Sequence, residues 1–304
     1  MKKDACDSAR GRADSHRNLD DLKSLRDKEK DLRDILSGCG RSLLAYSGGV
    51  DSALLAVMAQ DVLADSFAAI LADSPSLPAW EKEEALAFAA RQGFPLRVIR
   101  TEELESGAYR ANQLDRCFHC KLELFGRMEA IAKADGYDTL LYGGNLSDRS
   151  DHRPGIDAAH RFRVRAPLEE AGLLKEDVRS LARDLGLAVW DRPARACLAS
   201  RIPHFEEVSE EKLNQVANAE KVLFDEGFRE FRVRHHGDIA RIELGADEWE
   251  RLAEPELRAS VKSGIQIAGF PWVVLDLMPF RSGGLSRAAK DLEASGLTDG
   301  RERT

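Results

Sequence analysis

The sequence has no apolar run that approaches the roughly 18 residues needed to cross a bilayer. Its first residues, MKKDACDSARGRADSHRN, also lack the apolar core of a signal peptide. We therefore expect a cytoplasmic protein with no membrane partner. Basic residues are in deficit as well, because 45 Lys and Arg stand against 53 Asp and Glu, a net charge of -8. This balance argues against a general nucleic-acid-binding protein and leaves room only for a local basic patch.

Cysteine is scarce, with five residues in 304 and no spacing typical of a disulfide framework. In a reducing compartment such residues serve as thiols, metal ligands or nucleophiles. Apolar and charged residues are plentiful, at 43% and 32%, which is the composition of a globular protein. The chain is long enough for one large domain or two smaller ones.

Short apolar runs alternate with amphipathic patterns over the first two thirds of the chain. The predicted strands are SLLAYS, FAAILADS, PLRVIR and DTLLYGGN, and the predicted helices cover 22–36, 51–63, 80–92, 119–135 and 175–186. This alternation predicts an α/β fold, a parallel sheet with helices on both faces. Beyond it, the sequence predicts a helix at 209–226, two strands in FREFRVRHHGDIARIELG, a helix near 246–263 and a strand in WVVLDLM.

These patterns predict four segments along the chain. Residues 1–18 are highly charged and are expected to be disordered. Residues 19–204 form the α/β domain, and residues 205–285 form a small α+β domain. Residues 286–304 are polar and are expected to be a loose tail.

The string Ser47-Gly48-Gly49-Val50-Asp51-Ser52 directly follows the first predicted strand and opens a helix. Ligands of parallel sheets bind beyond the carboxyl ends of the strands, where a helix N-terminus offers free N–H groups to an anion. Two glycines allow the backbone to approach a phosphate, the two serine hydroxyls can donate to it, and the aspartate could help to hold Mg²⁺. A capped turn is the simpler alternative, but the complete string favours phosphate binding.

This string resembles the PP-loop of the ATP pyrophosphatases, which cleave ATP between its α and β phosphates to adenylate a substrate. In that family the end of the second strand contacts the adenosine, so the resemblance implies Asp73 and Ser74 in ILADSPS. The turn YGGNLSD, after a later strand, would place Gly144, Asn145 and Asp148 on the same rim.

The segment DRCFHCK places Cys117 and Cys120 at C-x-x-C spacing just before a predicted helix. Such a pair can chelate a metal or act as a redox dithiol, and it needs partners to complete a metal site. The third candidate is Cys197 in RACLASR, where the adjacent arginines would favour a thiolate. A small buried residue is an equal alternative for Cys197, while Cys6 and Cys39 are expected to be incidental.

A wider resemblance is carried by a series of segments in a fixed order: SGGVDS, DRCFHCK, GGNLSDRSDHRPG, APLEEAGLLKEDVRSLARDLGL, WDRPARACLASRIP, RVRHHGDIARIEL and FRSGG. Together they resemble the LarE family over about residues 20 to 285. The resemblance implies an ATP-dependent sulfur transferase in the assembly of the nickel-pincer nucleotide cofactor. Such an enzyme adenylates a carboxylate of pyridinium-3,5-biscarboxylic acid mononucleotide, and sulfur then displaces AMP to leave a thiocarboxylate.

The family includes two routes of sulfur delivery. One branch takes sulfur from a cysteine matching Cys197, which becomes dehydroalanine, and so needs no further cysteine. Another branch binds a 4Fe-4S cluster through cysteines matching Cys117, Cys120 and Cys197, all of which are present here. We expect the cluster route, since the sacrificial route gives no reason for a C-x-x-C. The external sulfur compound is not identified by the sequence.

Arg232 and Arg234 lie at a spacing of two in the segment FRVRHHGDIARIEL, on one face of a predicted strand. An alternating charged strand is more often a solvated face than a binding site. The resemblance implies that both, with Arg281, lie at the substrate or its phosphate, and that Glu220 and Glu243 lie nearby. It also implies a homo-oligomer.

Three other functions fit parts of the sequence. A tRNA-thiolating PP-loop enzyme would need a basic RNA-binding surface, against which the net charge of -8 speaks. An amide-forming ligase would leave the three cysteines unexplained. An adenine-nucleotide sensor would bind ATP without releasing pyrophosphate.

Overall fold

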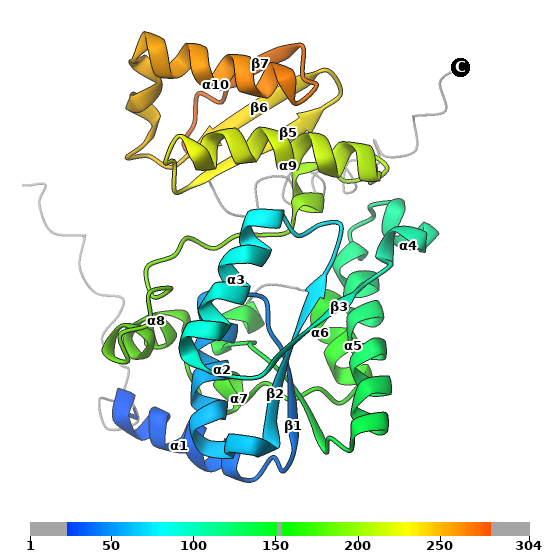
Figure 1. Cartoon of the computed structure of the whole chain (residues 1–304), viewed down its shortest axis with the longest axis vertical. Coiled ribbons are helices and arrows are strands. Elements are labelled where there is room, and N and C mark those ends of the chain that lie inside the picture. Colours follow the sequence, from blue (N-terminus) through cyan, green and yellow to red (C-terminus); the bar gives the residue numbers. More distant parts are fainter. Residues whose placement is uncertain (1–22, 151–153, 281–304) are drawn as a thin grey trace, which may run out of the picture.

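The computed structural model describes residues 23–150 and 154–280, which Figure 1 draws as a coloured ribbon. Within these residues the strands are β1 Ser42–Ala45, β2 Phe67–Asp73, β3 Leu96–Arg100, β4 Thr139–Tyr142, β5 Phe231–His236, β6 Ile239–Leu244 and β7 Trp272–Leu275. The α-helices are α1 Leu25–Ser37, α2 Val50–Leu63, α3 Ala79–Gln92, α4 Gly107–Arg110, α5 Arg116–Asp135, α6 Pro154–Arg161, α7 Pro167–Glu170, α8 Lys175–Asp184, α9 Glu210–Asp225 and α10 Pro255–Ile267. Short 3-10 helices are η2 Ala64–Ser66, η3 Glu103–Glu105, η4 Leu146–Ser150, η5 Leu198–Arg201 and η6 Trp249–Ala253. The predictions for residues 1–18 and 286–304 lie outside the described residues.

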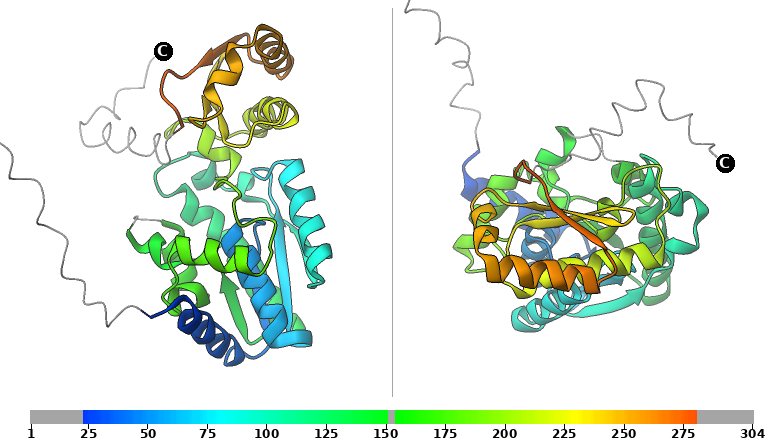
Figure 2. Two further views of the ribbon diagram at one scale, coloured as in Figure 1. Left: turned by 90° about the vertical axis from the view of Figure 1, so that its left-hand side faces the viewer. Right: turned by 90° about the horizontal axis from the view of Figure 1, so that it is seen from above.

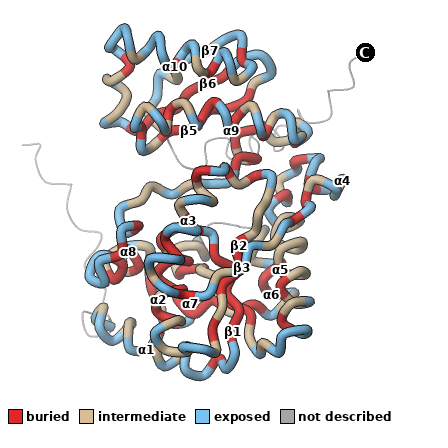
Figure 3. The backbone as a smooth tube through the Cα atoms, viewed as in Figure 1, coloured by how far each residue is buried: buried red, intermediate tan, exposed pale blue. Residues whose placement is uncertain are grey.

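The first sheet is parallel, with the strand order β3-β2-β1-β4. β1, β2 and β4 are mostly apolar and buried in the middle of the domain, whereas the edge strand β3 contains Arg97 and Arg100 and is partly exposed (Figure 3). Alternate residues of β1 enter two different cores. Leu44 packs in a core with α1, α2 and α8, whereas Leu43 packs in a core with α5 and α6. The predicted α/β fold with helices on both faces is therefore confirmed.

The second sheet belongs to a smaller domain that lies above the first sheet in Figure 1. β5 pairs with β6 in antiparallel and β6 pairs with β7 in parallel. Helices α9 and α10 pack on one face, where Val233, Ile242 and Ile265 share a separate core. Figure 2 shows both helices on the same side of this sheet. The predicted small α+β domain is confirmed, while its boundary at residue 205 stays a prediction.

Two predicted helices differ in detail from the structure. The helix expected near 246–263 is η6 followed by α10, because Pro255 begins a new helix at a position that needs no N–H donor. The sequence predicts that the C-x-x-C lies just before a helix. In the structure α5 begins at Arg116 and contains both cysteines. Among the described residues, no helix is both long and apolar enough to cross a membrane.

Candidate active site

The glycine-rich turn joins β1 to α2 at the carboxyl edge of the first sheet. Gly48 has φ +77°, and a Cβ there would lie 2.9 Å from the Cβ of Ala85 in α3. A Cβ on Gly143, just after β4, would lie 2.8 Å from the backbone nitrogen of Ser52. The turn after β4 therefore packs directly on the start of α2, which only glycines allow.

The first turn of α2 is organised by its serines. The Ser47 N–H donates to Ser52 Oγ over 3.2 Å, and the Ser52 hydroxyl donates to the carbonyl of Gly49 over 3.1 Å. Gly49 is the N-cap residue, so no side chain caps the helix. Free N–H groups at a helix N-terminus attract anions. They lie beside a pocket of about 120 Å³ whose lining includes Ser47, Asp51, Ser52, Lys121, Tyr142 and Gly143.

Asp51 is the centre of a polar network at this pocket. Its carboxylate accepts hydrogen bonds from Lys175 Nζ, at the start of α8, and from Asn145 Nδ2 over 3.0 Å. The Asn145 N–H in turn donates to Asp148 Oδ2 over 3.2 Å. The structure thus brings Asp51, Asn145 and Asp148 together, as the sequence predicted. Gly144 lies against the ring of Tyr142.

Lys175 and Lys121 are two cations of this site that the sequence interpretation missed. Lys175 is the first residue of α8, where the helix dipole disfavours a positive charge. A lysine at this unfavourable position was the sequence feature that could have indicated a functional residue. The ion pair with Asp51 offsets the unfavourable interaction of Lys175 with the helix dipole. Lys121 directly follows Cys120 in α5 and lines the pocket of about 120 Å³ at the glycine-rich turn.

Asp73 and Ser74, the predicted adenosine contacts, lie at the end of β2 on the same sheet edge. Asp73 accepts from Lys82 Nζ over 2.7 Å, and the Ser74 hydroxyl donates to Glu103 Oε1. Glu103 is 2% exposed, and its Oε2 has no hydrogen-bond partner among the described residues. The hydrogen-bond partners of Asp73 and Ser74 thus lie in α3 and η3, and not in the glycine-rich turn.

The three candidate cysteines lie near one another. Cys117 and Cys120 are three residues apart in the first turns of α5, so they share one helix face. Burial, and next the neighbouring sulfur of Cys197, raise the pKa of the Cys120 thiol to about 12. Cys117 and Cys197 are exposed. In residues 23–150 and 154–280, no three His, Cys, Asp or Glu side chains converge as a metal site.

The segment that carries Cys197 is fixed by buried hydrogen bonds. Leu198 N–H donates to the carbonyl of Ser76 over 2.9 Å, and the Ser76 hydroxyl is paired with that of Tyr109. Arg116, just before the C-x-x-C, donates to the carbonyl of Ala199 over 2.8 Å. These contacts bring the end of β2, the start of α5 and η5 together.

Arg232 and Arg234 are buried, at 4% and 5% exposure, and do not form a solvated face. Arg234 donates to Ser200 O over 3.0 Å and pairs with Glu243 over 2.7 Å. Arg232 donates to Ala194 O, and burial, followed by the charge of Arg201, lowers its pKa to about 10. Both guanidiniums therefore face the segment that carries Cys197.

The other predicted substrate residues differ in their surroundings. Glu220 is 1% exposed, and Arg201 donates to both of its carboxylate oxygens, over 2.8 and 2.9 Å. It also accepts the Val233 N–H over 2.9 Å, so its visible role is to join η5, α9 and β5. Arg281 lies outside the described residues.

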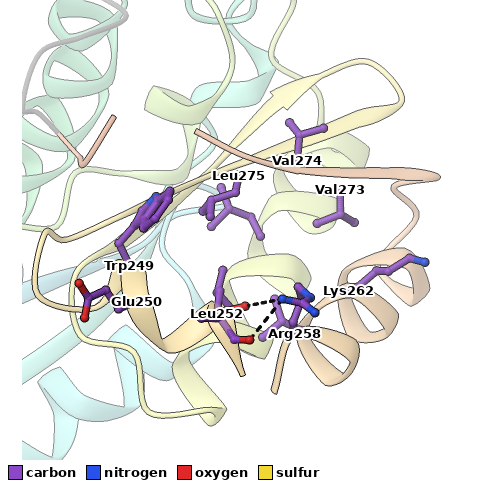
Figure 4. A pocket seen from close by; sticks show the side chains of 11 residues that line it. Trp249, Glu250, Leu252, Arg258, Lys262, Val273, Val274 and Leu275 are labelled. Atoms are coloured by element: carbon purple, nitrogen blue, oxygen red, sulfur yellow. Dashed lines mark hydrogen bonds between the residues drawn. The ribbon is translucent and has the colours of Figure 1, made fainter. Parts of the chain in front are cut away.

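A larger apolar pocket of about 690 Å³ lies within the second domain (Figure 4). Trp249, Leu252 and Leu275 contribute to its wall, and none of its lining residues belongs to the first domain. Arg258, which also lines this pocket, donates a hydrogen bond to the carbonyl of Leu252 over 3.2 Å. The pocket is thus separate from the residues of the candidate site.

Comparisons with known proteins place the chain among relatives that match most of its length. No protein-family model matches the chain. It is 40% identical over 263 residues to an uncharacterized protein of Synechocystis, covering 86% of this chain and 98% of the relative. It is 24% identical over 276 residues to a glutamine-hydrolyzing GMP synthase of Symbiobacterium thermophilum, covering 80% of this chain and 53% of that enzyme.

A third relative is the pyridinium-3,5-bisthiocarboxylic acid mononucleotide synthase of Lactiplantibacillus plantarum. The identity is 34% over 274 residues, which cover 87% of this chain and 96% of the synthase. Similarity of this extent covers most of the residues of both domains. The chain therefore belongs to the LarE family, of which this synthase is a member.

Proposed function

We propose that this protein is an ATP-dependent sulfurtransferase that converts carboxylates of pyridinium-3,5-biscarboxylic acid mononucleotide to thiocarboxylates. Membership of the LarE family supports sulfur insertion into this mononucleotide. The observation that carries the proposal is the composition of α5. Its first turns hold Cys117 and Cys120, and the next residue, Lys121, lines the pocket at the glycine-rich turn. A nucleotide phosphate and a sulfur group would therefore meet at one helix end.

In the first step, a substrate carboxylate oxygen attacks the α-phosphorus of ATP, and pyrophosphate leaves. Ser47, Gly48, Gly49 and Ser52 would hold the departing phosphates with the free N–H groups of α2. Lys121 and Lys175 would balance their charge, and Asp51 would hold Mg²⁺, which neutralises the phosphates when bound. Asp73, Ser74, Gly144 and Asn145 would surround the nucleoside on the same edge.

In the second step, a sulfur nucleophile attacks the acyl carbon, and AMP leaves. Adenylation is needed because a free carboxylate could lose only oxide, whereas AMP is a good leaving group. Attack by hydrosulfide gives the thiocarboxylate, AMP and one proton.

We propose that Cys117, Cys120 and Cys197 hold a 4Fe-4S cluster. Three neighbouring thiols are the donor type that such clusters use, although the described side chains do not converge as a metal site. A cluster with three cysteine ligands would supply one iron that is free to bind sulfide. The alternative is sacrificial transfer, in which Cys197 gives up its own sulfur and becomes dehydroalanine.

Arg232 is proposed to bind the phosphate of the mononucleotide. It is buried and has no carboxylate partner among the described residues, whereas Arg234 is paired with Glu243. A buried cation without an anionic partner is costly unless a ligand provides the anion. Glu220, Glu243 and Arg281 complete the proposed substrate region.

Pyrophosphate release provides the test of this function. Anaerobically purified protein, mixed with Mg-ATP, is expected to release pyrophosphate only when the pyridinium mononucleotide is added. Nucleotide binding without release would identify a sensor, and release that depends on tRNA would identify a tRNA-thiolating enzyme. Iron content and intact mass then separate the two sulfur routes. The cluster route leaves the chain mass unchanged, while the sacrificial route removes one H₂S from the chain per sulfur delivered.

A further inference from the structure

Glu103 is a buried carboxylate with a single hydrogen-bond partner. It begins η3, is 2% exposed, and accepts the hydroxyl of Ser74 at its Oε1. Its Oε2 has no partner, and no lysine or arginine of the described residues pairs with it. A carboxylate buried without a cation costs free energy of folding. The contact that Glu103 does make fixes the hydroxyl of Ser74.

The hydroxyl of Ser74 has one hydrogen-bonding position left. Its proton is donated to Glu103, and its oxygen accepts the Ser76 N–H over 3.0 Å. A serine hydroxyl has one proton and two acceptor lone pairs, whereas a carboxylate only accepts. Glu103 therefore makes Ser74 an acceptor toward any ligand. Ser74 itself is half-buried, so a ligand can reach it.

Ser74 lies where a nucleotide bound at the glycine-rich turn would present its base. β1 and β2 are adjacent parallel strands, and ligands of such sheets bind along the carboxyl edge. Ala45, the last residue of β1, pairs with Ile70, and β2 continues from there to Asp73. At about 3.3 Å per residue, β2 runs about 10 Å past the end of β1, which is comparable to the length of a nucleoside. A phosphate at the turn after β1 would thus place the far end of the nucleotide near Ser74.

Asp73 adds a second acceptor at the end of β2. Its carboxylate pairs with Lys82 over 2.7 Å, and 42% of its side chain is exposed. Ribose hydroxyls can donate or accept, so they do not need such an arrangement. The 6-amino group of adenine only donates, whereas the 6-oxo group of guanine only accepts. Acceptors at this position match the amine and oppose the oxo group.

We infer that Glu103 is a positioning residue that makes the nucleotide site selective for a 6-amino purine. Glu103 does not touch the nucleotide. It holds the proton of Ser74 away from the ligand, so that Ser74 Oγ accepts from the amine. This inference rests on the nucleotide-binding part of the proposed function, and it adds the residue that rejects 6-oxo purines. Sulfur delivery plays no part in it.

Binding of Mg-ATP and Mg-ITP to the full-length protein provides the test. ITP carries an oxo group in place of the 6-amino group, and calorimetry gives the Kd of each nucleotide. In the wild-type protein ITP should bind at least about tenfold more weakly, because an acceptor would face an acceptor. Equal affinities would overturn the inference alone. A protein that binds neither nucleotide would overturn the proposed function as well, so the two failures are distinguishable.

Variants assign the selectivity to single residues. Glu103→Leu frees the Ser74 proton to donate to the oxo group, so the Kd for ITP should fall and the ratio should drop below about threefold. Ser74→Ala should lower the ratio by raising the Kd for ATP about fivefold, because the amine loses its acceptor. Glu105→Leu is the matched control, since Glu105 belongs to the same 3-10 helix but is exposed, and its ratio should equal that of the wild type. A wild-type ratio in Glu103→Leu would refute the inference.

Stability and a second analogue separate this role from two others. Glu103→Leu removes a buried carboxylate that lacks a cation, so the urea midpoint should not fall. A lower midpoint with equal weakening of ATP and ITP would mean that Glu103 only supports the fold, against the inference. 2′-Deoxy-ATP, which lacks a ribose hydroxyl, should bind as ATP does in wild type and in Ser74→Ala. Weaker binding of 2′-deoxy-ATP that disappears in Ser74→Ala would place Ser74 at the ribose and overturn the assignment to the amine.

Discussion

Asp51 has a position in the structure that separates it from Asp61, the other aspartate of α2. It lies in the first turn, accepts hydrogen bonds from Lys175 and Asn145, and lines the pocket at the glycine-rich turn. Asp61, in the last turn of the same helix, pairs with Arg33 at the surface. The chemistry proposed for this site therefore depends on a single carboxylate of the helix.

We expect Asp51→Ala to lower pyrophosphate release by at least about 100-fold, because Lys175 and Mg²⁺ would both lose their anionic partner. Asp61→Ala, whose side chain is 61% exposed, should retain wild-type activity. Pyrophosphate release measures both variants, and circular dichroism checks that they are folded. Full turnover by Asp51→Ala in the presence of Mg²⁺ would show that Asp51 is not part of the active site.

Arg232 offers a second comparison between single residues. Arg232→Gln should raise the KM for the mononucleotide about tenfold or more and leave the KM for ATP unchanged, since charge-assisted hydrogen bonds to phosphate would be lost. Arg229→Gln is the control, because Arg229 lies three residues away and forms an exposed pair with Asp191. Equal rises in both KM values would show that Arg232 serves ATP or the fold.

Among the elements, η5 contacts both domains. Its residues Leu198 and Ala199 pack in the core of the second domain, while hydrogen bonds join this segment to Ser76, in the loop after β2, and to α5 of the first. The Arg201–Glu220 pair joins η5 to α9 and is 1% exposed at both side chains. We therefore expect the geometry around Cys197 to depend on this buried pair.

Arg201→Met should lower the free energy of unfolding by about 3–5 kcal/mol, because Glu220 would be left buried and charged without its partner. Lys221→Met is matched to it, since the adjacent Lys221 pairs with Asp225 where both side chains are about half exposed. That variant should cost less than about 1 kcal/mol. Urea unfolding measures both, and similar small losses would show that the buried pair adds little to stability.

At the scale of the whole molecule, the second domain has several large apolar side chains that are highly exposed. Ile267, Trp272 and Leu277 are 85%, 67% and 85% exposed, and β7, which contains Trp272, is an edge strand of its sheet. Exposed apolar groups at a sheet edge are typical of surfaces that contact another chain. This surface supports the proposed homo-oligomer.

We expect light scattering after gel filtration to give a mass larger than the 33.7 kDa of a single chain for the wild-type protein. Trp272→Glu should shift the mass toward that of a single chain, because a charge would be buried between copies. Trp190→Glu, at a tryptophan of the first domain that is 39% exposed, should leave the mass unchanged. A wild-type protein that is monomeric at micromolar concentration would contradict the proposal.

The alternation of short apolar runs and amphipathic helices was enough to predict the parallel sheet, because periodicity records which faces of an element are buried. The string from Ser47 to Ser52 was likewise enough to predict a phosphate site, since the glycines, the hydroxyls and the helix start are adjacent in the chain; phosphate binding itself stays a prediction. Boundaries were less certain, as with the start of α5 at Arg116, where the N-cap residue Asp115 makes no side-chain capping hydrogen bond.

The pairing of charges was beyond the reach of sequence patterns. Lys175 meets Asp51 across 124 positions, and Arg116 meets the carbonyl of Ala199 across 83. Arg195 and Arg201 adjoin Cys197 in the chain, yet their charges are balanced by Glu84 and Glu220. Which charges pair depends on how every neighbouring side chain is oriented, and that is a property of the packed fold because Coulomb interactions act through space and not along the chain.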